Sequence, residues 1–227
     1  TDVQRITLLG RVHCDLMFVD QSGRREPLPL KISAANGFEY FVPTREATFS
    51  GFSDRPLRPD NQVLVERPLP GGTSDQLYCS RIVVKLQPEV SEQPGRPPNS
   101  QLTVAEISAD GRKVLFRSEQ QRLMASMNQL RYRIDDHVME MIGRPNAATG
   151  KTNPVEIHQD RRKLTAPSIT VSLDQDNQIR SIRCNGPGSV NPSDSNPFPT
   201  ASHAEVPGQE MQVEAEWQQS LVWNRSE

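Results

Sequence analysis

The stretch "DQLYCSRIVVKL" at residues 75–86 decides the fold, because "RKLTAPSITVSL" at residues 162–173 repeats its pattern. Each stretch has an apolar residue, a small residue two positions later, and then apolar residues three and five positions beyond the small one. Steps of two are typical of a β-strand, whose alternate side chains share one face. The single step of three predicts a bulge or corner, where the strand bends from one face to the next.

Looser copies of this pattern occur along the whole chain at a nearly constant spacing. The small residues of the five copies are Ala34, Cys79, Ala125, Ala166 and Ala215, with separations of 45, 46, 41 and 49 residues. In three copies a second strand follows and ends near a glycine, at Gly51, Gly143 and Gly186. A regular period of this length is typical of repeat architectures. We therefore predict an all-β fold built of stacked hairpin units of about 45 residues.

The small residue has a physical role in such a unit, since it lets two sheet faces approach closely where they meet. Cys79 occupies the alanine position of the pattern, so we interpret it as a buried small hydrophobic residue. The other cysteines, Cys14 and Cys184, lie far from it in sequence and form no CxxC motif, which argues against a metal site. Three cysteines cannot all pair within the chain, but two of them could form one disulfide bridge.

One segment, residues 118–143, allows two interpretations. Its apolar residues step by three and four, which is the spacing of an amphipathic helix. Against this, Leu130, Tyr132 and Ile134 alternate, and Asp135-Asp136-His137 is a good turn between two strands. We prefer two strands and keep the helix as the alternative.

Composition limits the kinds of protein that the chain can be. Hydrophobic residues make up 34% of it and there are 19 prolines, which predicts many turns and long polar loops. Two Pro-rich stretches, near 87–101 and 187–208, are expected to be such loops inside a single domain covering 1–227. A net charge of −2 implies no general attraction to nucleic acid. There is no run of about 18 apolar residues and no signal peptide, so we expect no transmembrane segment and an origin in a longer protein.

The stretch "GRPNAATGKT" at residues 143–152 ends like a phosphate-binding loop, but a turn explains it better. Such a loop needs glycine five positions before Gly150, where Pro145 stands, and the following Asn153 to Ile157 is typical of a turn and a strand. His158 and Asp160 lie close together without a serine elbow or metal-ligand spacing. We predict no catalytic residues, no cofactor and no metal.

Several stretches together resemble a known family. These are "GFEYFVPTREATFSG" with "VLVERP" at residues 37–68, the first repeat stretch, and the run from "LRYRIDDHVMEMIGRPN" to "VEIHQDRRKLTAPSITVSLDQDNQIRSIRCNGPG" at residues 130–188. They resemble the OstA-like (LptA-like) lipopolysaccharide-transport domain. The resemblance implies a bent two-sheet β jelly roll, or β-taco, whose interior holds acyl chains. It also implies modules that join end to end as a periplasmic bridge toward the outer membrane.

The resemblance and the apolar pattern together name candidate site residues. The candidates for lining a lipid groove are Phe38, Tyr40, Phe49, Leu77, Ile82, Phe116, Leu123, Leu130, Tyr132, Leu164, Ile169 and Val171. Arg161, Arg162 and Lys163 are candidates for contacts with lipid phosphates. We expect a non-catalytic carrier in the cell envelope whose partners are a lipid amphiphile and neighbouring β modules. The alternatives are a structural β-repeat segment with a filled core and, less favoured, an enzyme built on a β scaffold.

Overall fold

All regular secondary structure in the described part of the chain is β-strand, as the sequence predicts. A computed structural model describes residues 3–18, 28–55, 58, 60–69, 72–88, 102–144, 153–160, 162–174, 179–192 and 214–225. Its eighteen strands form one large sheet, and all pairings between strands are antiparallel. In the ambiguous segment 118–143 the strand interpretation is confirmed, with a turn at 134–137.

The strand pairings divide the sheet into two halves. The front half runs, neighbour by neighbour, through β1 (Arg5–Leu9), β4 (Gly37–Phe41), β5 (Glu46–Ser50), β8 (Arg81–Pro88), β9 (Leu102–Ser118), β10 (Leu123–Arg133), β11 (Val138–Ile142), β14 (Ser168–Leu173), β15 (Ile179–Asn185) and β18 (Ser220–Asn224). The back half runs through β2 (Val12–Phe18), β3 (Leu28–Ala34), β6 (Val63–Pro68), β7 (Ser74–Cys79), β9, β10, β12 (Val155–Gln159), β13 (Arg162–Ala166), β16 (Gly188–Pro192) and β17 (Ala215–Trp217).

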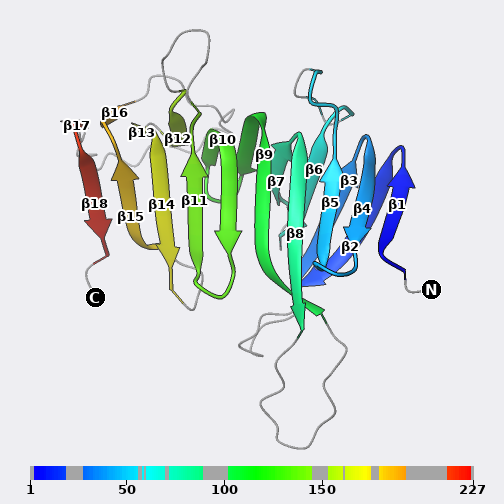
Figure 1. Cartoon of the computed structure of the whole chain (residues 1–227). Helices are drawn as coiled ribbons and strands as arrows, with labels where there is room; N and C mark the ends of the chain where they lie inside the picture. The colour runs from blue at the N-terminus through cyan, green and yellow to red at the C-terminus, as the bar shows by residue number, and fades with distance from the viewer. Residues whose placement is uncertain are drawn as a thin grey trace, which may run out of the picture.

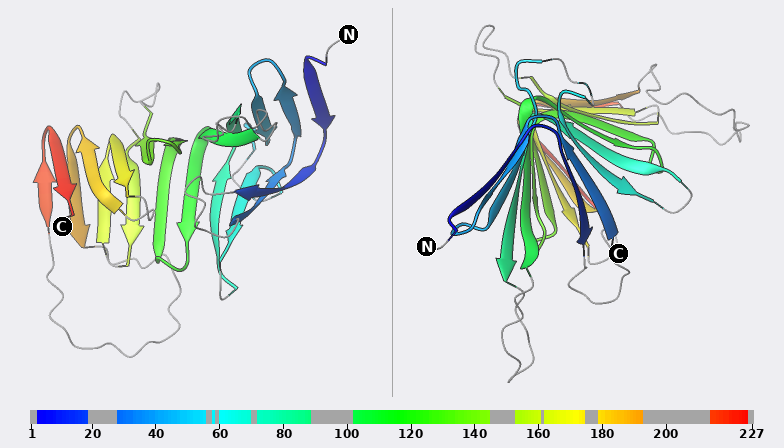
Figure 2. Two further views of the ribbon diagram at one scale, coloured as in Figure 1. Left: turned by 90° about the horizontal axis from the view of Figure 1, so that it is seen from below. Right: turned by 90° about the vertical axis from the view of Figure 1, so that its right-hand side faces the viewer.

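The long strands β9 and β10 belong to both halves and join them. The first part of β9 pairs with β8 as far as Asp110, and its last part, from Leu115 to Ser118, pairs with β7. Between these parts the sheet folds along a line that we call the crease. Seen end-on, the two halves diverge from the crease as a V (Figure 2), and the strands stack side by side along it (Figure 1).

Elsewhere the chain passes from one half to the other at the crease, where one strand ends and the next begins. β7 ends at Cys79 in the back half and β8 begins at Arg81 in the front half. The same change occurs at Pro167, between β13 and β14, where the parity of the apolar positions shifts. The corner predicted from the step of three is therefore a fold of the whole sheet.

Two of the five small residues lie out of line with the others. Ala125 pairs with Phe116, which pairs with Leu77, so it lies one inward position away from Cys79. Ala215 is likewise displaced from Ala166, because it pairs with Val190, the partner of Leu164. In these two units a large residue can occupy the position next to the crease if its cross-strand partner is small. Trp217 does so beside Gly188, whose added Cβ would lie 2.4 Å from the indole ring.

Strands extend into both of the stretches that were expected to be long loops. The first of these stretches was expected from residue 87, but β8 continues to Pro88. The second was expected from residue 187, but Gly188–Pro192 forms β16, which pairs with β13. Proline has no backbone N–H to donate, but a strand can end with it because no further hydrogen bond is needed there. A high proline content therefore does not locate the ends of these strands. Residues 89–101 and 193–208 lie outside the described residues.

The hydrophobic core lies along the inner side of the crease. Its most completely buried side chains include Ala34, Val63, Cys79, Val114 and Val155 in the back half, each 0% exposed. In the front half Phe49, Ile82 and Ile169 are at most 2% exposed. Small and β-branched residues dominate at the crease because the two halves are closest there, and the burial of these side chains stabilises the V.

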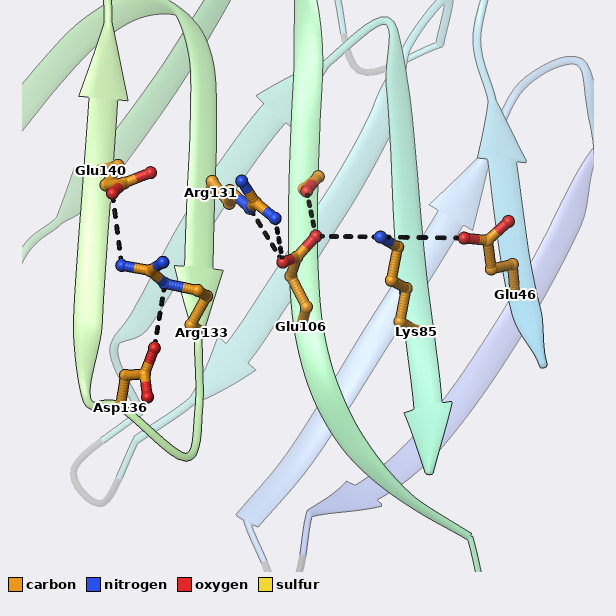
Figure 3. A network of polar contacts seen from close by, with 8 residues as sticks. Glu46, Lys85, Glu106, Arg131, Arg133, Asp136 and Glu140 are labelled. Atoms are coloured by element: carbon orange, nitrogen blue, oxygen red, sulfur yellow. Dashed lines mark hydrogen bonds and ion pairs between the residues drawn. The ribbon is translucent and has the colours of Figure 1, made fainter. Parts of the chain in front are cut away.

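The outer face of the front half carries a network of ion pairs across five strands (Figure 3). Glu106 of β9 is central. It accepts a hydrogen bond from Arg131 Nε at 2.8 Å and lies 3.5 Å from Lys85 Nζ, which also reaches Glu46 at 3.8 Å. Farther along, Arg133 of β10 binds Asp136 and Glu140. Opposite charges on neighbouring strands stabilise the pairing register.

Glu106→Gln is expected to lower the free energy of unfolding at neutral pH by about 1 kcal/mol. Burial alone would raise the pKa of Glu106, but the hydrogen bond and charge of Arg131, with Lys85, outweigh it and lower the pKa. The carboxylate therefore stabilises the fold above its unfolded-state pKa of about 4.3, and this is lost as pH falls through the lower folded pKa. Urea unfolding of both proteins at several pH values measures the difference, which should vanish in acid. A difference that stays constant with pH would contradict it.

Candidate functional site: the inner face of the folded sheet

The inner face of the V is built from residues that alternate along the strands and align across them. Next to the crease lies what we call the first row: in the front half Leu8, Phe38, Phe49, Ile82, Ala109, Leu130, Met141, Ile169, Cys184 and Leu221, and in the back half Ala34, Val63, Cys79, Val114, Met127, Val155 and Ala166. Two residues farther from the crease lies the second row: in the front half Ile6, Tyr40, Ala47, Val84, Ile107, Tyr132, Met139, Val171, Ile182 and Trp223, and in the back half Cys14, Ile32, Val65, Leu77, Phe116, Ala125, Ile157, Leu164, Val190 and Ala215. Both rows are almost wholly apolar.

Burial on this face is most complete in the first row of the back half. It is mixed in the second row, where Ile32, Leu77 and Val84 are at most 8% exposed while other residues are half-buried. In the back half the first row is at most 3% exposed. Phe116, Ile157 and Leu164 in the second row are only partly buried, although they pack against the core. In the front half the second-row residues Tyr40 and Ile107 are likewise half-buried, whereas Ile82 in the first row is fully buried. Apolar surface on the inner face is thus in contact with solvent where the two halves diverge.

All twelve predicted lining residues lie on this inner face. Six are buried in the core: Phe49, Leu77, Ile82, Leu130, Ile169 and Val171. Five are half-buried and pack against it: Phe38, Tyr40, Phe116, Leu123 and Leu164. Tyr132 is also half-buried, and the register aligns it with Ile107 and Met139. The half-buried residues are the ones that a ligand could contact.

A third row, in the back half, carries polar residues beside apolar ones such as Leu123, and sequence inspection missed most of the polar ones. Asp75, only 5% exposed, accepts a hydrogen bond from Arg67 Nε at 3.0 Å and also contacts Arg67 Nη2. Arg67 follows Val63 and Val65 at the strand period, and Asp75 precedes Leu77 at the same period. Period-two parity could have found both, but a charged residue at a strand end is usually assigned to solvent. The margin of the inner face therefore carries charge next to apolar surface.

The predicted basic triplet is divided between the two faces. Arg161 lies outside the described residues. Arg162, which is exposed, shares the inner parity of Leu164 and belongs to the third row with Gln159, its cross-strand partner. Lys163 lies on the outer face, where its Nζ is 3.0 Å from Glu156 Oε1. Of the two described members of the triplet, Arg162 is the one at the margin of the inner face.

The histidine and the acidic residues that drew attention in the sequence lie away from the inner face. His158 is on the outer face of β12, 3.9 Å from Glu156, and burial followed by the charge of Lys163 lowers the pKa of its imidazole. Asp135 and Asp136 lie in the turn after β10. Among the described residues, no three His, Cys, Asp or Glu side chains are grouped so that they could hold a metal ion.

The three cysteines are free thiols and give a chemical test of the fold. Burial raises the pKa of the Cys184 thiol to about 11 and raises that of Cys79 further, with Asp110 adding to the shift. We expect the half-buried Cys14 to react with a thiol reagent in the native protein, and Cys79 and Cys184 to react only on unfolding. Ellman's reagent followed by peptide mapping measures the order of reaction. Native labelling of Cys79 as fast as that of Cys14 would contradict the placement of the first row.

Comparison of the chain with known protein families, with characterised proteins and with solved structures returns no match. The fold defines a class: an all-β protein whose described strands form one antiparallel sheet, folded into a V with an apolar inner face. No helix in the described ranges is long and apolar enough to span a lipid bilayer.

Proposed function

We propose that this chain binds a lipid amphiphile of the lipopolysaccharide type between the two halves of its sheet and carries it, without catalysis, across the periplasm toward the outer membrane. The observation that carries the proposal is the partial exposure of apolar second-row residues such as Phe116, Ile107 and Tyr132 on the inner face. A partly exposed apolar surface inside a V can remove acyl chains from water, and each buried CH₂ contributes roughly 0.8 kcal/mol. The polar residues of the third row would then lie beside the headgroup.

In this proposal the fold is a β-taco jelly roll of stacked units about 45 residues long. The crossings of the crease between β3 and β4, β7 and β8, and β13 and β14 support it, because in each case a strand of the back half is followed by one of the front half. A ligand would enter between the halves from the side away from the crease. The resemblance to OstA-like domains is the source of the cellular location that we propose.

Four terminal strands support the proposal that modules join end to end. β1 and β2 at one end, and β17 and β18 at the other, each pair with one neighbour among the described strands. Unpaired strand edges can accept a strand from another chain. Apolar side chains accompany them: Ile6 and Leu8 are 46% and 48% exposed, and Trp223 is 48% exposed. A neighbouring β module that covers these ends would continue both halves and the inner face.

The second candidate function is a structural β-repeat segment whose core is filled and holds no ligand. The observation that favours it is the first row, where Val63, Val114 and Val155 are completely buried. Such a row is a packed core, and it leaves room for a ligand only farther toward the mouth. The two functions differ in whether the half-buried second-row residues meet lipid in the cell.

Photo-crosslinking separates these functions. A photoreactive amino acid replaces Phe116 or Tyr132 on the inner face, and matched controls carry it at the neighbouring Leu115 or Arg131, which alternate to the outer face. After irradiation of cells of a Gram-negative bacterium that export the chain, we expect lipid adducts from the inner positions and not from the outer ones. Absence of adducts from every inner position, or equal adducts from both faces, would refute the carrier function.

A further inference from the structure

We propose that the outer side of the crease is a docking ridge for the phosphate-bearing headgroups of an anionic lipid surface. Seven exposed basic residues follow the turning points of the chain along the crease and define this ridge: Arg11, Arg55, Arg58, Arg81, Arg112, Lys113 and Arg144. The ion pairs between described residues involve none of the seven. Basic residues elsewhere, such as Arg67 and Arg131, are paired with carboxylates.

The ridge lies on the face of the sheet opposite to the apolar interior. Val114 and Ile82 point inward and are at most 1% exposed, whereas their neighbours Lys113 and Arg81 are exposed. Arg144 is held at the crease by its backbone N–H, which donates to Asn128 Oδ1 at 3.0 Å. From β1 to β11 the ridge crosses six strand spacings, about 29 Å at roughly 4.8 Å each. It is therefore a second surface, independent of the inner face and of the function proposed for it.

The middle of the ridge is hollowed. The hollow has a volume of about 360 Å³ and is lined by Ser53, Asp54, Arg55, Gln62, Ser80, Arg112 and Lys113. Three positive charges against the one of Asp54 leave an excess of two positive charges in the lining. The basic residues come from two separate parts of the chain, the segment between β5 and β6 and the bend of β9, so the fold brings them together.

Fixed polar groups form the wall of this hollow. Gln62, only 2% exposed, donates a hydrogen bond from Nε2 to the Phe52 carbonyl at 2.9 Å. The Phe52 ring in turn lies 4.1 Å from the guanidinium carbon of Arg55. The Gln62 Oε1 atom is buried and has no hydrogen-bond partner among the described residues. A headgroup with phosphate oxygens and hydroxyl or amine hydrogens fits this lining, since the arginines and serines donate while Asp54 accepts.

A lipid surface suits the whole ridge better than a soluble anion does. Arginine grips phosphate in a bidentate manner, and six of the seven basic residues are arginine. A single small anion could engage only the hollow, whereas a bilayer presents phosphates along the full length. The net charge of the whole chain is −2, so attraction to anionic lipid would come from the local excess of the seven basic residues over the nearby Asp54, Asp60 and Asp110. Each basic residue near an anionic bilayer strengthens binding by about fivefold.

The test is cosedimentation of the whole chain with vesicles at low ionic strength. We expect binding to vesicles containing phosphatidylglycerol and not to vesicles of phosphatidylcholine alone, with binding lost as salt rises. The triple variant R55Q/R112Q/K113Q should lose about a hundredfold in partitioning. The control variant R122Q/R133Q/K163Q removes the same charge from residues away from the crease and should lose much less. Circular dichroism must show that both variants are folded.

Three outcomes would overturn the proposal. The first is equal vesicle binding by the two triple variants. The second is that inorganic phosphate shifts NMR signals of the hollow while vesicles do not bind, which would assign a site for free phosphate. The third is that heparin binds to the ridge and phosphatidylglycerol vesicles do not, which would assign a soluble polyanion. Crosslinking at Phe116 is a separate readout, so failure of the ridge and failure of the proposed carrier function are distinguishable.

Discussion

Gly143→Ala should lower the free energy of unfolding by about 3 kcal/mol or more. Gly143 follows β11 at the crease, and its N–H donates to the Pro167 carbonyl at 2.9 Å. A Cβ built on Gly143 would lie 1.9 Å from the Asn153 carbonyl oxygen, which is backbone and can move only if the chain entering β12 moves. Chemical denaturation of the variant and the native chain measures the loss.

Gly72→Ala is the matched control for this prediction. Gly72 has a φ of 84°, so alanine there is strained, but nothing lies within 4 Å of its added Cβ. Its cost should be near 1 kcal/mol, from the backbone conformation alone. If the two variants lose equal stability, the close approach of Gly143 to Asn153 does not exist in solution and the crease is wider than described.

The same close approach explains why strands end near glycine in the sequence. Gly51, in the equivalent exit from β5, would place a Cβ 2.6 Å from Gln62 Cα. Gly186 has a φ of 79° and faces Pro167. The glycines that marked the second strand of each unit therefore lie where the chain leaves the front half, and the physical reason is crowding at the crease.

Apolar spacing allowed prediction of the strands and of the inward-facing residues. The step of three between Cys79 and Ile82, and between Ala166 and Ile169, also located the crease, because a change of parity requires a change of direction. In β9 and β10 the inward positions also shift parity, from Ala109 to Val114 and from Met127 to Leu130. Sequence could not show that at these two crossings the strand continues through both halves and does not end. That continuity decides that there is one sheet and not two.

The charged features could not be predicted, because they depend on which turning points lie together. Arg55 and Arg112 are 57 residues apart in sequence and line the same hollow. Parity with Val65 and Leu77 indicates that Arg67 and Asp75 face inward, but only the register shows that they lie opposite each other. The stacking of segments that are distant in sequence decides where charged residues gather. Composition and net charge carry no information on that arrangement.

Phe49→Ala should cost about 3–5 kcal/mol of stability, the second large effect that the structure implies. The Phe49 ring is 2% exposed, lies in the first row between Phe38 and Ile82, and has a centroid 4.8 Å from that of Phe38. Truncation would leave a cavity at the crease, where the rigid pairing of β4, β5 and β8 prevents collapse. Thermal and urea unfolding measure the loss.

Phe38→Ala provides the comparison, since the two rings are cross-strand partners and differ in burial. Because Phe38 is only half-buried, Phe38→Ala should lower the free energy of unfolding by about half as much as Phe49→Ala does. If lipid occupies the mouth of the V, Phe38→Ala should reduce lipid crosslinking at the inner face while the protein stays folded. An equal loss of stability in both variants, with crosslinking unchanged by Phe38→Ala, would mean that the core is filled as far as Phe38, as in the structural alternative.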